Sequence, residues 1–211
     1  MTLTSILNFF GCKGKIQPEE TKKDAEFEQF LEQTKNSIDE FKNRKIYKIL
    51  TSEILDSISD DKLEQAIMDN IDTKFQDGEQ YTLDKISKLT NGQQAVFSTW
   101  WLEAEVNNGG FNQFYFNSSG QFAEMAENGF MTIGAQKFSQ LTKRANKIYS
   151  ENKERLAEFD DGTMESFSES YKDNPLNDLD TEFYNLYDSE KIGELRIKYI
   201  RENKNEFITE E

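Results

Sequence analysis

Apolar residues recur at every third or fourth position along most of this chain, which is the spacing of one face of an α-helix. The pattern is clearest from Phe27 to Phe41, from Leu63 to Phe75, from Phe138 to Tyr149 and from Ile192 to Tyr199. Alternating runs of β-branched residues, the usual signal of a strand, do not occur, and there are only 2 prolines. The sequence therefore predicts an all-α fold, a single compact multi-helix domain with N- and C-terminal helical extensions.

Short polar signals predict where some of these helices begin and end. Asp77-Gly78 is expected to end the helix that contains Leu63, because aspartate and glycine tolerate the backbone angles of a turn. Asn128-Gly129 is expected to end a later helix through a left-handed cap. Ser118 and Gln121 are three residues apart, the spacing of a capping box, and predict the start of that later helix.

Charge is distributed unevenly along the 211 residues. Residues 91–150 carry four acidic and four basic side chains, whereas residues 151–211 carry 18 acidic and eight basic ones. We therefore expect three segments: a flexible or weakly docked N-terminus (1–23), a helical core domain (24–155) and an acidic helical extension packed on the core (156–211).

The composition excludes several classes of function. A formal net charge of −15 repels phosphates and anionic lipids and attracts basic surfaces, so we expect a basic protein partner, with no direct binding to nucleic acid or membranes. The chain has no histidine, the commonest general base and metal ligand, and no phosphate-binding or calcium-binding loop. We expect no catalytic residues, no metal site and no cofactor; a homodimer is compatible with these features.

The location is predicted from a single cysteine and from the apolar opening, MTLTSILNFFGC. Cys12 cannot form an internal disulfide and suits a reducing compartment, so we expect a cytoplasmic protein. The opening is too short to span a bilayer and has no basic residue before its apolar run. A docked N-terminus, export and lipidation at Cys12 are the alternatives for this stretch.

Residues 105–120, EVNNGGFNQFYFNSSG, hold three of the 11 glycines and resemble no other part of the chain. One interpretation is a structural corner. Asn108-Gly109-Gly110 tolerate positive φ and would reverse the chain, so that the aromatic residues that follow return to the core beside the two tryptophans of the preceding helix. The amides of Asn107, Asn112 and Gln113 would then bond backbone groups that the corner leaves unpaired.

A second interpretation of the same stretch is a small polar pocket lined by Glu105, Asn107, Asn108 and Gln113. Amides and one carboxylate can hold a small ligand but form a weak catalytic set. If the protein were an enzyme, Glu103 and Glu105 would be the first carboxylates to suspect, because carboxylate pairs can support hydrolysis.

The stretch WWLEAEVNNGGFNQFYFNSSG, followed by MTIGAQKF, resembles the signature E-x-N-N-G-G-F-x-Q-F of the DNA-mimic protein family. The matching positions are Glu105, Asn107, Asn108, Gly109, Gly110, Phe111, Gln113 and Phe114. The resemblance covers residues 40–155 and implies an all-helical domain. It also implies an acidic surface that imitates the phosphate charge of duplex DNA and occupies the DNA-binding face of a transcription factor. Much of the acidic segment 156–211 lies outside the resemblance.

Carboxylates in the last third of the chain are the predicted partner-binding surface. On a helix, side chains at i and i+4 lie about 5–6 Å apart, so rows at this spacing can approximate a strand of phosphates. The predicted rows are Glu154, Glu158 and Asp161; Glu165, Glu169 and Asp173; and Glu190 with Glu194. An immunity-type protein that neutralises a basic toxin would need the same acidic face, and this alternative stays open, as does an uncharacterised enzyme with a pocket at the motif.

Overall fold

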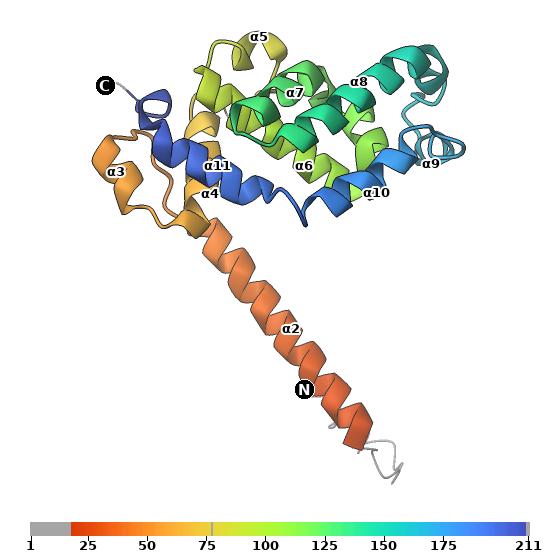
Figure 1. Cartoon of the computed structure of the whole chain (residues 1–211). Helices are drawn as coiled ribbons and strands as arrows, with labels where there is room; N and C mark the ends of the chain where they lie inside the picture. The colour runs from red at the N-terminus through yellow and green to blue at the C-terminus, as the bar shows by residue number, and fades with distance from the viewer. Residues whose placement is uncertain (1–17, 77, 210–211) are drawn as a thin grey trace. The chain divides into compact units, whose positions relative to one another are not determined.

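The computed structural model describes residues 18–76 and 78–209, and within them every regular element is a helix (Figure 1). The predicted all-α fold is confirmed. The chain divides into two units, with the boundary between Lys45 and Ile46. The apolar opening and most of the predicted segment 1–23 lie outside the described residues. Among the described helices, none is both long enough and apolar enough to cross a lipid bilayer.

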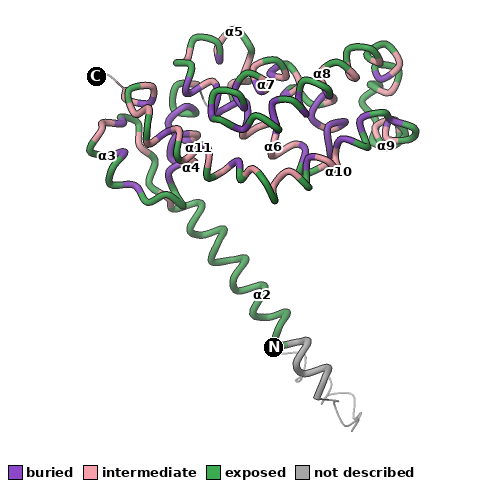
Figure 2. The backbone as a smooth tube through the Cα atoms, in the orientation of Figure 1, coloured by how far each residue is buried: buried purple, intermediate pink, exposed green. Residues whose placement is uncertain are grey.

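The helices are unequally divided between the two units. The first unit holds α2 (Pro18–Lys42), in which the side chains described, those of residues 25–42, are all exposed (Figure 2). The elements of the second unit are α3 (Ser52–Ser57), α4 (Asp60–Asp72), α5 (Leu83–Ile86), α6 (Asn91–Phe116), η1 (Ser118–Phe122), α7 (Ala123–Thr132), α8 (Gln136–Ala157), α9 (Met164–Glu169), α10 (Asn177–Leu186), α11 (Ile192–Glu202) and η2 (Lys204–Glu206).

The second unit is built around α6, which packs against α7, α10 and α4. α8 packs against α7 and α10, and α11 packs against α4. The buried side chains form two apolar clusters. The first cluster lies among α6, α7, α8 and α10 and includes Phe114, Phe138 and Phe183; the second lies around α4 and the start of α6 and includes Leu63 and Phe97.

The aromatic residues on either side of the two glycines of α6 belong to different clusters. Phe111 and Phe114 are buried in the first cluster, where the ring of Phe111 packs edge to face on Phe183 at a centroid distance of 5.7 Å. Trp101 packs on the second cluster, against Phe97 and Tyr81. The expected return of the aromatic residues to a place beside the tryptophans is therefore wrong, because α10 supplies the surface on which they pack.

The acidic last third of the sequence supplies core residues as well as surface. Leu179 and Phe183 of α10 belong to the first cluster. Ile200 of α11 and Phe207 belong to the second cluster. All four side chains are buried, so residues 156–211 contribute to both parts of the core.

α6 begins with a capping box that the sequence-based prediction missed. Thr90 Oγ1 accepts a hydrogen bond from the Gln93 N–H at 3.2 Å, and Gln93 Oε1 accepts one from the Thr90 N–H at 3.4 Å. The capping box predicted at Ser118 and Gln121 is wrong, because the short helix η1 occupies this segment and α7 begins after it. Gln121 instead accepts a hydrogen bond from the Leu83 N–H at 2.8 Å.

α7 does not end at Asn128-Gly129 as predicted but continues past both residues, and Gly134 adopts the left-handed φ of 87°. Gly129 has a packing role instead. A Cβ atom at Gly129 would lie 2.9 Å from Ser98 Oγ and 3.0 Å from Thr99 Cγ2, which belong to α6. Glycine is therefore needed where the two helices approach closely.

α4 ends earlier than predicted, at Asp72, and its C-cap residue Thr73 donates its N–H to Asp69 O. Phe75 lies beyond the helix yet still packs on the second cluster, where its ring contacts Tyr81 edge to face at a centroid distance of 5.2 Å. Gly78, which was expected to help end this helix, has a φ of 77°.

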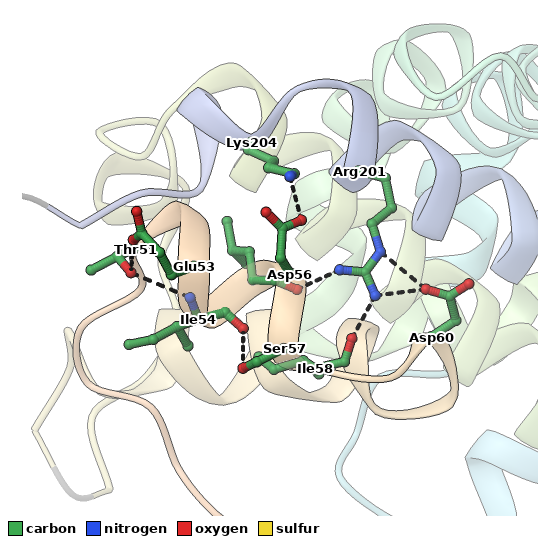
Figure 3. A network of polar contacts seen from close by, with 10 residues as sticks. Thr51, Glu53, Ile54, Asp56, Ser57, Ile58, Asp60, Arg201 and Lys204 are labelled. Atoms are coloured by element: carbon green, nitrogen blue, oxygen red, sulfur yellow. Dashed lines mark hydrogen bonds and ion pairs between the residues drawn. The ribbon is translucent and has the colours of Figure 1, made fainter.

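Arg201 joins the beginning of the second unit to its C-terminal helix (Figure 3). Its guanidinium binds Asp60 Oδ1 at 2.6 Å and donates to Ile58 O at 2.5 Å and to Leu55 O. Lys204 forms an ion pair with Asp56 on α3. These bonds satisfy carbonyl groups at and just beyond the end of α3 that have no helical partner, and they fix α3 against α11.

Candidate functional site

The two glycines of the Asn-Gly-Gly motif interrupt α6 without ending it. Gly109 (φ −160°, ψ 26°) and Gly110 (φ 75°, ψ −179°) are not helical, and the chain resumes a helix that runs to Phe116. The predicted corner is thus a kink within a helix. The backbone angles of Gly110 are accessible essentially to glycine alone, and a Cβ atom there would lie 2.2 Å from Asp180 Oδ2.

Side chains from the last third of the chain satisfy the backbone groups exposed by the kink. The Phe111 N–H donates to Asp180 Oδ1 at 2.8 Å. The Tyr171 hydroxyl donates to Gly109 O at 2.7 Å, and the Tyr184 hydroxyl donates to Val106 O at 2.9 Å. The kink is therefore complete only when α10 and the segment after α9 are folded against it.

The amides of the motif were expected to perform this role, and the structure shows that they bind side chains instead. Asn107 Nδ2 donates to the Tyr187 hydroxyl at 3.2 Å. Asn112 Nδ2 donates to Ser170 Oγ at 2.7 Å, and Asn112 Oδ1 accepts from Asn174 Nδ2 at 2.7 Å. Each of these bonds again joins the motif to the last third of the chain.

Glu105, the carboxylate of the predicted polar pocket, accepts three side-chain hydrogen bonds. The donors are Gln113 Nε2 at 2.7 Å, Asn117 Nδ2 at 2.8 Å and Ser119 Oγ at 3.0 Å. The space beside Gly109 is also filled, because a Cβ atom there would lie 2.2 Å from Gln113 Oε1. Asn108 is exposed, and among the described residues its side chain has no hydrogen-bond partner. The groups that would hold a ligand are thus mostly bound to one another.

Glu103 takes part in a buried ion-pair network. Arg196, whose side chain is 2% exposed, binds Glu64 Oε2 at 2.5 Å and also binds Glu103. The Tyr187 hydroxyl donates to the other oxygen of Glu103 at 2.5 Å, and burial together with this carboxylate raises the pKa of Tyr187. Both carboxylate oxygens of Glu103 are therefore bound to other side chains of the protein.

Asp180, which supports the kink, is partly withdrawn from water. Burial raises the pKa of its carboxyl group, and the hydrogen bond from the Phe111 N–H partly opposes this shift. Prediction from the sequence missed Asp180 and Arg196. The sequence does contain a signal for Arg196, because this residue lies four positions after Ile192 and four before Ile200, on the same face of a helix. In the structure all three side chains are buried.

Six of the predicted partner-binding carboxylates lie together at one end of the second unit, which we call the acidic end (residues 151–173). In Figure 1 it comprises the C-terminal turns of α8, the loop that follows and α9. All six side chains are exposed. They are Glu154, Glu158, Asp161, Glu165, Glu169 and Asp173.

The acidic end does not have the continuous helical rows that the spacing predicted. α8 ends at Ala157, so Glu158 is a cap residue and Asp161 lies in a turn. α9 ends at Glu169, and Asp173 has a φ of 53°, outside any helix. The carboxylates are therefore displayed from two helix ends and the turns between them.

Several carboxylates of the acidic end are free of bonds to the rest of the described chain. The side chains of Glu154, Glu158 and Glu165 form no hydrogen bond or ion pair with any described residue. Asp161 accepts bonds from the Thr163 hydroxyl at 2.7 Å and N–H at 2.9 Å, which lower its pKa. Glu169 forms an exposed ion pair with Lys172 at 2.7 Å, so the uncompensated negative charge of the acidic end is mainly that of Glu154, Glu158 and Glu165.

Glu190 and Glu194, the other two predicted carboxylates, lie elsewhere. Glu190 accepts hydrogen bonds from the Lys137 N–H at 3.0 Å and from the Phe138 N–H at 3.3 Å, and so caps the start of α8. Along α8, this cap lies about 20 Å from the nearest residue of the acidic end. Glu194 forms an exposed ion pair with Lys191 at 3.2 Å.

A family model described as DMP19-like protein matches residues 87–203. The chain belongs to the DMP19-like family. No curated protein and no solved structure matches it. The DMP19-like span runs from the start of α6 to the end of α11, so it contains the kink, the buried Arg196 and the whole acidic end.

The DMP19-like span corrects the expected limits of the family resemblance, which were residues 40–155. The acidic segment that was expected to lie largely outside the family lies within it up to residue 203. The hydrogen bonds from Tyr171, Asp180 and Tyr184 to the kink give the physical reason. In the folded protein these bonds join the motif to the C-terminal helices, and both lie within the DMP19-like span.

Proposed function

We propose that this protein is an acidic protein-binding module that imitates the phosphate charge of duplex DNA and occupies the basic DNA-binding surface of a partner, such as a transcription factor. The observation that supports it most directly is the acidic end, within the family span, where Glu154, Glu158 and Glu165 are exposed and have no partner among the described residues. The resemblance of the motif to the DNA-mimic protein family points in the same direction.

Charge density is the property that the acidic end shares with DNA. Duplex DNA carries one negative charge per about 1.7 Å of its axis, and residues 151–173 carry eight acidic and three basic side chains. Because the carboxylates come from helix ends and turns, their spacing does not follow a single phosphate strand. We therefore expect the partner to recognise the concentration of charge, with binding that depends strongly on salt.

Catalysis is not part of this proposal. Glu103 is bound by Arg196 and Tyr187, and Glu105 is bound by three donors; these bonds support a structural role for both carboxylates. A partner that binds DNA and a chain with a single cysteine both suit the cytoplasm.

The test begins with capture of the partner from a host lysate on the immobilised full-length protein, followed by measurement of the affinity for the purified partner. Raising the salt concentration from about 50 to about 200 mM should weaken binding steeply. Duplex DNA should compete for the same surface of the partner. Binding that is insensitive to salt would contradict the proposal, and salt-sensitive binding without competition from DNA would favour a basic toxin as the partner.

A charge-neutralised variant locates the binding surface. Replacing Glu154, Glu158 and Glu165 together by glutamine removes three charges without breaking a bond to another described residue, and should lower the affinity severalfold or more. A matched control removes three exposed charges from α5, α7 and α11. The control substitutions are Asp84→Asn, Glu124→Gln and Glu202→Gln. Equal losses for the two triple variants would mean that net charge, and not the acidic end, determines binding.

A further inference from the structure

α2 has an apolar face that is exposed along the first unit; of its side chains, the ring of Phe41 is partly covered by the guanidinium of Arg44, which lies 3.7 Å from the ring centroid. Its side chains Phe27, Phe30, Leu31, Ile38 and Phe41 are between 47% and 61% exposed. Phe30, Thr34, Ile38 and Phe41 border a shallow groove along this face. A 25-residue helix with exposed aromatic residues on one side is expected to bind a partner surface, since such contiguous apolar patches are unusual on a free monomer.

The spacing of this face matches helix-to-helix pairing. The positions along this face follow one another at alternating intervals of four and three, an average of 3.5 residues. They are Phe27, Leu31, Thr34, Ile38 and Phe41, and all but Thr34 are apolar. A repeat of 3.5 is the period of a left-handed coiled coil, in which alternate positions form the seam. The spacing therefore favours packing of this face against another helix that has the same repeat.

We infer that α2 pairs with α2 of a second copy of this chain, in an antiparallel arrangement that places Leu31 opposite Thr34. In this register Phe27 lies opposite Ile38 of the second copy, so every layer contains at least one large apolar side chain. Glu28 flanks the seam and faces Lys35 of the second copy, and the symmetry of the pair creates this contact twice.

The parallel arrangement is less favourable in its apolar layers and in its charge pairs. It would place Thr34 against Thr34 at the middle of the seam, and it would bring Lys35 beside Phe30 of the second copy instead of beside Glu28. Charge complementarity and apolar layering thus select the same antiparallel register. Because α2 lies outside residues 87–203, this pairing does not depend on the proposed function.

The test measures the mass of the full-length protein in solution by sedimentation or light scattering, over a range from about 1 to about 100 μM. We expect the mass of two chains at the upper concentrations and dissociation on dilution, because the seam covers only about two heptads. The double variant Leu31→Gln, Ile38→Gln should be monomeric throughout while keeping its helix content, since glutamine is a good helix former. A monomer at every concentration, or a dimer that survives this double variant, would overturn the inference.

Charge exchange tests the register. Lys35→Glu alone and Glu28→Lys alone should each weaken the dimer severalfold, because each places like charges opposite one another, and the double exchange should restore it. Lys42→Glu is the matched control, since it changes the net charge as Lys35→Glu does but lies outside the contact between Glu28 and Lys35. Failure of the double exchange to restore the dimer would contradict the antiparallel register.

Discussion

The kink in α6 and the acidic end lie within the same family span, yet they use their polar side chains in opposite ways. At the kink, Glu105, Asn107, Asn112 and Asp180 all bind other groups of the chain. At the acidic end, Glu154 and its neighbours face solvent with few internal partners. Polar groups withdrawn from water must be paired within the fold, whereas exposed ones can remain available for a partner. The kink is accordingly a structural element and the acidic end is the candidate surface.

The largest expected effect on stability concerns the ion pairs of Arg196 with Glu64 and Glu103. Arg196→Met removes the only arginine that binds Glu64 and Glu103 and leaves two poorly solvated carboxylates without a counter-ion among the described residues. Breaking a buried pair in this way costs about 3–5 kcal/mol. Denaturant unfolding of the variant measures this loss. Arg144→Met, which breaks an exposed pair with Glu182, is the control and should cost less than about 1 kcal/mol.

A smaller loss is expected at the kink itself. Gly110→Ala forces an alanine to a φ of 75° and places its Cβ atom 2.2 Å from Asp180 Oδ2, so we expect a destabilisation of about 2–4 kcal/mol. In Gly193→Ala, the new Cβ meets no atom within 4 Å. This control should be neutral or stabilising by up to about 1 kcal/mol, because alanine is the better helix former. Similar melting temperatures for the two variants would show that the kink is not held in place by Asp180.

The sequence predicted those parts of the fold that depend on local spacing. The stripe from Phe138 to Tyr149 became α8, because an amphipathic period needs no knowledge of the partner surface. Glycines with a positive φ were expected at the motif, and Gly110 has a φ of 75°. Gly129 was misinterpreted because its role is set by the distance to α6, which the local sequence does not encode.

The partners of the kink could not be predicted, since they are far away in the chain. Asp180 binds a residue 69 positions earlier, and Arg196 binds one 93 positions earlier. Nothing near residues 105–120 indicates that a carboxylate and two tyrosines from the last third will complete this segment. At the acidic end the composition was informative, but the helical rows were wrong because α9 has only six residues.

The pH dependence of stability tests the role of Asp180 at the kink. Burial raises the pKa of Asp180 above its ordinary value of 3.8, so the folded state holds this proton more tightly than the unfolded state does. The contribution of Asp180 to stability is therefore greatest below pH 3.8 and declines as the pH rises through the raised pKa. Asp180→Asn removes this decline while an amide oxygen can still accept from the Phe111 N–H.

Other carboxylates titrate in the same range, and Asp161, whose pKa is lowered, contributes in the opposite sense. The informative quantity is consequently the difference in unfolding free energy between Asp180→Asn and the wild type, measured from low to neutral pH. We expect this difference to shift in favour of the variant as the pH rises. A difference that stays constant would show that Asp180 has an ordinary pKa in the folded protein.

The smallest effect on stability is expected at the acidic end. In the variant with Glu154, Glu158 and Glu165 replaced by glutamine, no bond to another described residue is lost, and repulsion among neighbouring carboxylates is reduced. The unfolding free energy should therefore change by no more than about 0.5 kcal/mol, with any gain larger at low salt, where repulsion is less screened. If this variant instead lost as much stability as Gly110→Ala, the acidic end would be a structural element like the kink, and the contrast between the two regions would fail. A stable variant that no longer binds the partner is the result that separates folding from binding in this molecule.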